Sequence, residues 1–136
     1  MRGVRTRRRV SAETVETSAR SVARVLLAKA EGPVDEPPTW LVVAKALGVR
    51  VLGFYGLPGD GPGYYEAATQ TVYYNLRAPK SERARYIVHE LAHHILATWP
   101  GGGCQRVALE RYDDDRQTVQ HRVARRVEEI VLGCAG

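Results

Sequence analysis

The sequence of 136 residues has few of the features that mark membrane or secreted proteins. It contains no run of about 18 apolar residues, the length that a membrane-spanning helix requires. Its basic start is not followed by an uncharged apolar segment, because Glu13, Glu16 and Arg20 interrupt that region, so a secretory signal is not expected. Two cysteines, Cys104 and Cys134, are too few for a disulfide framework. We therefore expect a cytoplasmic protein that does not attach to membranes.

Signatures of several other protein classes are missing as well. The sequence shows no internal repeat, no long low-complexity tract and no helix-turn-helix pattern. Its glycine-rich segments, 56–63 and 101–103, lack the G-x-x-x-x-G-K-[ST] pattern that cradles phosphates. Repeat proteins and P-loop nucleotide-binding proteins are therefore excluded as interpretations.

Positive charge is concentrated at the N-terminus. Twenty Lys and Arg residues against fifteen Asp and Glu leave a net charge of +5. The first ten residues alone contain Arg2, Arg5, Arg7, Arg8 and Arg9. This pattern predicts a flexible basic arm over residues 1–10 and a single near-neutral domain over residues 11–136. The arm is the one segment that could contact nucleic acid, and a solvated tail without a partner is the alternative interpretation.

Hydrophobic periodicity predicts the order of the elements. Two helices come first, then three short strands of which the last two form a hairpin, then two more helices. This order predicts an α+β fold in which one small, mostly antiparallel sheet packs against about four helices. The expected elements are helices over 11–30 and 39–47, strands over 49–54, 64–67 and 72–76, and helices over 81–97 and from about 113 to 132.

The motif that carries chemistry is His89-Glu90-Leu91-Ala92-His93, an H-E-x-x-H pattern. Residues four apart on a helix share one face, with Cβ atoms about 5–6 Å apart, so both imidazoles can reach one zinc ion. Glu90 can stand in the same site as a general base rather than as a ligand. With four histidines in the chain, roughly 0.008 such matches are expected by chance, although a polar helix face with salt bridges is the alternative interpretation.

A zinc site needs at least a third protein ligand. The last predicted helix offers His121 and Glu128, seven residues apart at the border of its apolar arc. Ligand chemistry places His121 first and Glu128 second, whereas Gln120 is a poor zinc ligand. Glu110 and Asp113–Asp115 remain further candidates, and a surface position is the alternative interpretation for His121.

Several of these residues resemble the ImmA/IrrE family of zinc metallopeptidases over residues 39–132. The segments that carry the resemblance are Ala46-Leu47-Gly48-Val49, Tyr73-Tyr74-Asn75 and Arg85-Tyr86-Ile87-Val88-His89-Glu90-Leu91-Ala92-His93-His94. In that family a later helix supplies a glutamate ligand, and His121 occupies the matching position here. The resemblance implies a zincin-like fold, with His89, His93 and His121 on zinc and Glu90 as the catalytic residue. It also implies an endopeptidase whose substrate is a phage-type or stress-response repressor, such as a helix-turn-helix protein.

A second hypothesis is a non-catalytic regulator. Such a protein would keep the zincin-like shell, bind a transcription factor or DNA, and hold a metal only structurally or not at all. The motif favours the enzyme, because a structural site has no need of Glu90 beside its ligands. We expect His94 to be a packing histidine rather than a ligand, since it projects about 100° away from His93 around the helix.

Overall fold

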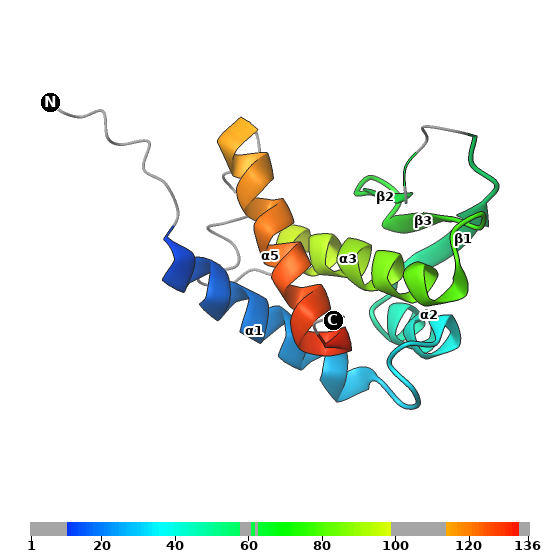
Figure 1. Ribbon diagram of the computed structural model, residues 1–136, viewed down its shortest axis with the longest axis horizontal. Helices are drawn as coiled ribbons and strands as arrows, with labels where there is room; N and C mark the ends of the chain where they lie inside the picture. The colour runs from blue at the N-terminus through cyan, green and yellow to red at the C-terminus, as the bar shows by residue number, and fades with distance from the viewer. Residues whose placement is uncertain (1–10, 58–60, 62, 99–113, 134–136) are drawn as a thin grey trace, which may run out of the picture.

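The computed structural model describes residues 11–57, 61, 63–98 and 114–133, which form four helices and one three-stranded sheet (Figure 1). The predicted α+β class is confirmed. The predicted arm over residues 1–10 and both cysteines lie outside the described residues. In chain order the elements are α1 (Ala12–Lys29), α2 (Pro37–Ala46), β1 (Arg50–Phe54), β2 (Gly63–Glu66), β3 (Thr71–Asn75), α3 (Lys80–Thr98) and α5 (Asp114–Leu132).

Local signals set the ends of the first two helices. The hydroxyl of Ser11 accepts a hydrogen bond from the Thr14 backbone N–H (3.0 Å), which satisfies one of the free donors at the start of α1. Helix α2 begins at Pro37 rather than at the expected Thr39, so the linker predicted over 33–38 is shorter. Proline suits this first-turn position because its φ is already helical and its missing N–H has no partner there.

The sheet has the strand order β1-β3-β2. The predicted hairpin is confirmed, since β2 and β3 pair antiparallel with Tyr64 opposite Tyr73. Strand β1 pairs with β3 in parallel, so the sheet is mixed where a mostly antiparallel one was expected. The segment between Phe54 and Gly63 is too long for a tight hairpin, and it takes the chain past the place of β3. Strand β3, with the fully buried Val72, therefore occupies the centre.

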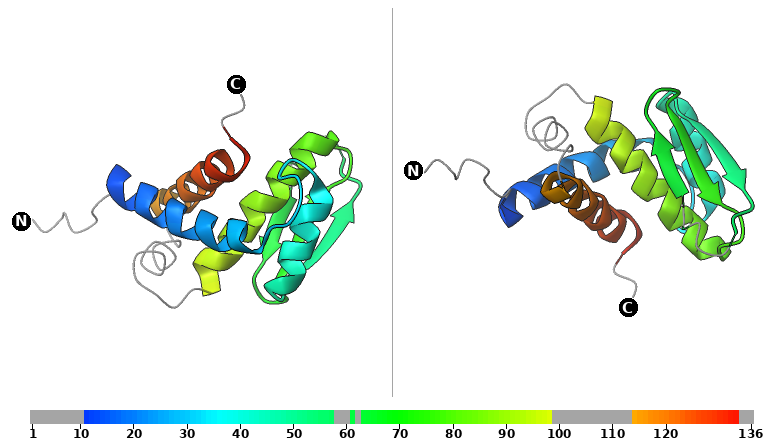
Figure 2. Two further views of the ribbon diagram at one scale, coloured as in Figure 1. Left: turned by 90° about the horizontal axis from the view of Figure 1, so that it is seen from below. Right: turned by 90° about the horizontal axis from the view of Figure 1, so that it is seen from above.

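Helix α3 lies at the middle of the molecule. It packs against β2 and β3 on one side and against α5 on the other, while α1 covers α5 and α2 lies beside α3 and β1 (Figure 2). Its apolar residues Ile87, Val88 and Leu91 are fully buried, as expected for a helix surrounded by other elements. Among the described residues, no helix combines the length and apolar character that crossing a bilayer requires.

Candidate metal centre

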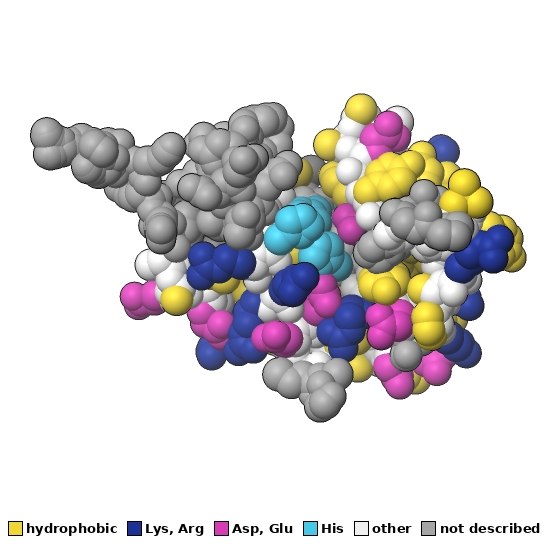
Figure 3. All heavy atoms as spheres, turned by 45° about the horizontal axis from the view of Figure 1, so that its top comes forward, with side chains coloured by type: hydrophobic (Ala, Val, Ile, Leu, Met, Phe, Trp, Pro, Cys, Tyr) yellow, Lys and Arg dark blue, Asp and Glu magenta, His cyan; other side chains and the backbone are white. Residues whose placement is uncertain are grey.

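Helices α3 and α5 bring three histidines together. His89 and His93 lie one turn apart on α3, and His121 comes from α5. Their ring centroids are 4.9 to 5.3 Å apart, and one nitrogen of each ring lies within 4.8 Å of the other two. In Figure 3 histidine side chains reach the surface between the helices and the sheet, next to acidic and basic groups. The three predicted metal ligands thus converge on one point.

The carboxylate of Glu128 fixes the orientation of His89. Nδ1 of His89 lies 2.5 Å from one oxygen of Glu128, whose other oxygen accepts a bond from Arg85 at 3.3 Å. An ionised carboxylate only accepts hydrogen bonds, so Nδ1 donates this one, and in the neutral imidazole Nε2 then keeps its lone pair. Glu128, the second candidate for the third ligand, is therefore the partner of a histidine and is not part of the converging group. A carboxylate bound to the far nitrogen of a metal-binding histidine is a common arrangement.

Gln120 orients His93 in the same way. Its amide oxygen accepts from Nδ1 of His93 at 2.7 Å, which again leaves Nε2 free. The pKa of His93 is lowered to about 4, mainly by its removal from water and in part by His89 when that ring is charged, against the opposing effect of the bond to Gln120. Burial also lowers the pKa of His121. Neutral imidazoles with a free nitrogen are the form in which histidine binds metals.

Sequence reasoning missed this role of Gln120. The residue was judged only as a zinc ligand, for which an amide is poor. A signal was nevertheless present, because Gln120 falls within the apolar arc of α5, beside His121, and is 7% exposed. A buried amide needs hydrogen-bond partners, so a polar residue at such a place indicates a partner across the helix interface.

Glu90 lies on α3 between the two motif histidines and is 7% exposed. The pKa of Glu90 is raised to about 7, mainly by burial; within this net value the charge of His89 lowers the pKa and the charge of Glu128 raises it. A carboxyl group with this pKa exchanges its proton readily near neutral pH. Carboxyl groups that act as catalytic acids or bases are commonly tuned in this direction by burial.

His89 and His121 line a cleft of about 510 Å³ between α3, α5 and β2. Gly63 of β2 stands at its border, where an added Cβ would lie 2.2 Å from the backbone oxygen of Tyr73. A side chain at that position would meet the backbone of β3 unless one of the two strands shifts. The residues that line the cleft are Gly63, Arg85, Tyr86, His89, Glu90, His121, Arg125, Glu128 and Glu129.

Among the remaining candidates, the structure describes the side chain of His94 alone, and it is not part of the converging group. His94 is buried against the sheet, where its Nδ1 lies 2.7 Å from the hydroxyl of Tyr65, in agreement with the predicted packing role. Glu110 and Asp113 lie outside the described residues. Only the backbone of Asp114 and Asp115 is described, as the first turn of α5.

The chain matches no family model, no curated protein and no solved structure. The resemblance to the ImmA/IrrE family therefore depends on the residues of the sequence alone, and the centre is interpreted from its own geometry.

Proposed function

We propose that this protein is a zinc-dependent endopeptidase that hydrolyses a peptide bond in a protein substrate. The observation that carries the proposal is the convergence of His89, His93 and His121, each with one nitrogen within 4.8 Å of the other two, beside the buried carboxyl group of Glu90. The contacts of Glu128 and Gln120 support it, because they hold two of the three imidazoles with Nε2 free.

The donor set fits zinc. A tetrahedral site with Zn–N bonds of about 2.0–2.1 Å places its nitrogens about 3.3 Å apart, so the rings need to approach by at most about 1.5 Å. Three neutral imidazoles with an open fourth position are a ligand set of catalytic zinc. A zinc ion held there would supply a Lewis acid that polarises a carbonyl group and lowers the pKa of water to near 7.

Glu90 moves the protons of the reaction. A cation at the three histidines stabilises the carboxylate form of Glu90, which shifts its pKa down from about 7 and makes it a base. The carboxylate then takes a proton from the attacking water and returns it to the nitrogen of the leaving amine. Its burial keeps bulk water away from that exchange.

Strand β2 can present the substrate. It pairs with β3 on one side only and borders the cleft at Gly63, so within the described residues its other edge keeps backbone donors and acceptors that no strand uses. An extended peptide can add to such an edge through main-chain hydrogen bonds. This mode of binding suits cleavage inside a polypeptide. The ImmA/IrrE resemblance suggests a repressor of the helix-turn-helix type as the protein that is cleaved.

Zinc content and cleavage together test the proposal. The full-length protein, purified without chelator, should contain about one zinc per chain by elemental analysis, and should cleave members of a random peptide library. Glu90→Gln should keep the zinc and lose cleavage, since general-base catalysis contributes about 10²–10⁴-fold. Zinc near zero in the unmodified protein would overturn the proposal. Full cleavage by Glu90→Gln would remove Glu90 from the reaction.

A further inference from the structure

The two arginines of the cleft differ in their ionic partners. Arg85 forms an ion pair with Glu128 at 3.3 Å, and Glu129 forms one with Arg126 at 3.0 Å. Arg125 also lines the cleft, but within the described part of the chain it has no ion pair or side-chain hydrogen bond. Within the described residues no acidic group therefore lies at ion-pair distance from its guanidinium, although Glu128 and Glu129 line the same cleft.

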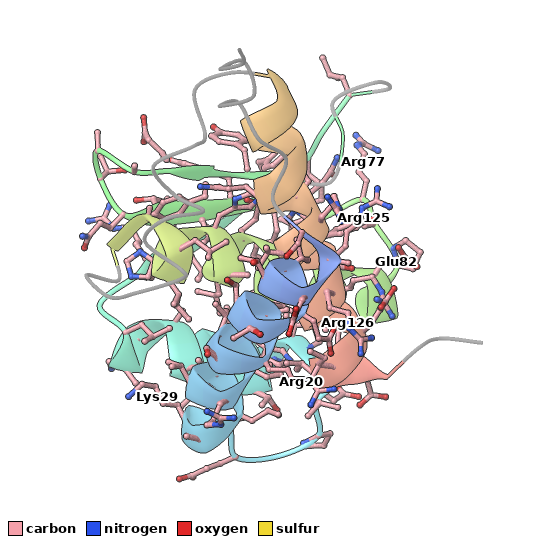
Figure 4. The ribbon with its side chains drawn as sticks, turned by 90° about the vertical axis from the view of Figure 1, so that its left-hand side faces the viewer. Arg20, Lys29, Arg77, Glu82, Arg125 and Arg126 are labelled. Atoms are coloured by element: carbon pink, nitrogen blue, oxygen red, sulfur yellow. The ribbon has the colours of Figure 1, made fainter. Side chains whose placement is uncertain are left out.

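The position of Arg125 directs this charge toward the metal centre. Arg125 follows His121 by four residues on α5, a spacing that places both side chains on the same face of the helix. Arg126 turns instead toward α1, where it bonds Glu16 at 2.7 Å, and Figure 4 shows the two arginines leaving α5 in different directions. Arg125 is exposed, so a ligand in the cleft can reach it.

We infer that Arg125 is a specificity-determining residue that binds a carboxylate of the substrate near the bond that is cleaved. This inference rests on the proposed function and names its substrate class: peptides with an acidic side chain close to the scissile bond. A C-terminal carboxylate offers the same chemistry, and a preference for it would make the enzyme a carboxypeptidase instead of an endopeptidase. The planar guanidinium can form two parallel hydrogen bonds with a carboxylate, which gives direction as well as charge. A basic side chain at the same place would meet a positive charge, so the cleft would select against it.

Binding of paired ligands tests this inference without requiring turnover. The probes are short peptide hydroxamates, which bind zinc through the hydroxamate group, offered to the zinc-loaded full-length protein. In the first pair, one peptide carries aspartate and the other carries asparagine at the same position. That position is varied, so that each position beside the hydroxamate is tested in turn. A second pair differs only in a C-terminal carboxylate against an amide. The first pair reports an acidic side chain, and the second reports a chain terminus.

Three variants separate Arg125 from general electrostatics. The unmodified protein should bind the acidic member of one pair about tenfold more tightly, the effect of a charged hydrogen-bond partner. Arg125→Gln should reduce this preference to less than about twofold, and Arg125→Glu should reverse it. Arg122→Gln is the matched control, because Arg122 is exposed on the same helix and does not line the cleft. It should keep the preference.

The outcomes distinguish this inference from the proposed function. Equal binding of both members by the unmodified protein, no binding of any hydroxamate, or a preference that survives Arg125→Gln would overturn the role of Arg125. Cleavage of library peptides without an acidic preference would reject this inference and keep the peptidase. An acidic preference in binding without any cleavage would keep carboxylate binding by Arg125, but it would reject the peptidase and with it the role of Arg125 in substrate selection.

Discussion

Replacing Glu128 by glutamine tests whether the partner of a ligand controls the metal centre. The carboxylate lies 2.5 Å from Nδ1 of His89 and also binds Arg85 at 3.3 Å. Glutamine has nearly the same shape and can still accept one hydrogen bond through its oxygen. It loses the negative charge, and its amide N–H₂ would face the guanidinium of Arg85 if its oxygen stays on His89. The substitution therefore weakens the hold on His89 while the imidazole remains present.

The size of the effect follows from this geometry. Mutation of a side chain that orients a metal ligand lowers metal affinity about 10- to 100-fold, which corresponds to about 1.4–2.8 kcal/mol of binding free energy. Glu128 and His89 are only 13% and 14% exposed, so water screens their interaction less than it would at the surface. We expect zinc affinity to fall within this range. Replacing a direct ligand would lower zinc affinity further, because that change removes a bond to the ion.

Competitive titration with a chromophoric chelator measures the zinc affinity of the unmodified protein and of Glu128→Gln. The matched control is Glu129→Gln, which makes the same chemical change at the next residue, where the carboxylate is 46% exposed and bonds Arg126. The control should bind zinc as the unmodified protein does. The cobalt-substituted protein should keep its absorption spectrum in Glu128→Gln, since the ligand set is unchanged.

Two results would contradict this reasoning. Zinc affinity of Glu128→Gln within about twofold of the unmodified protein would show that the carboxylate does not support His89. A loss beyond about 1,000-fold together with a changed cobalt spectrum would identify Glu128 as a direct ligand. In that case the contact with Nδ1 of His89 would not describe the metal-loaded protein.

Three further predictions concern the ligand set, the border of the cleft and acid stability. His121→Ala should weaken zinc binding by more than about 100-fold, because it removes one of three ligand nitrogens. The chelator titration measures this, and a smaller loss of zinc affinity than the one caused by Glu128→Gln would contradict it. Gly63→Ala should lower the free energy of unfolding by about 1–3 kcal/mol, because the Cβ of the alanine would meet the backbone oxygen of Tyr73 at 2.2 Å. Urea unfolding measures this change, and an unchanged midpoint would show that β2 shifts freely. Hydrogen bonds from Arg126 and Arg20 lower the pKa of Glu16 to about 2 in the folded protein, so its stabilising effect is present above pH about 4.5 and is lost as the pH falls toward 2. The difference in unfolding free energy between the unmodified protein and Glu16→Gln should therefore shrink over that range, and a difference independent of pH would refute the ion pair.

The elements were predictable because their signals are local. Ser11 before an apolar period of 3.6 predicts the start of α1, and the structure shows the predicted cap. The hairpin of β2 and β3 follows from two alternating runs joined by a short turn. The parallel pairing of β1 with β3 was not predictable in this way. It depends on which strand occupies the centre of the sheet, and a strand pattern does not specify its neighbours.

The sequence by itself determined that His89, Glu90 and His93 share one region of a helix, because a period of 3.6 residues fixes the relative directions of side chains four apart. It also limited the third ligand to a short set on the last helix. Only the tertiary structure decided that His121 joins the two motif histidines while Glu128 and Gln120 bind their far nitrogens. The physical reason is that the periodicity of α5 defines its apolar face, whereas the packing of α5 against α3 sets its rotation and depth. If α5 were rotated about its axis by one residue, a neighbouring side chain would face the metal centre in place of His121.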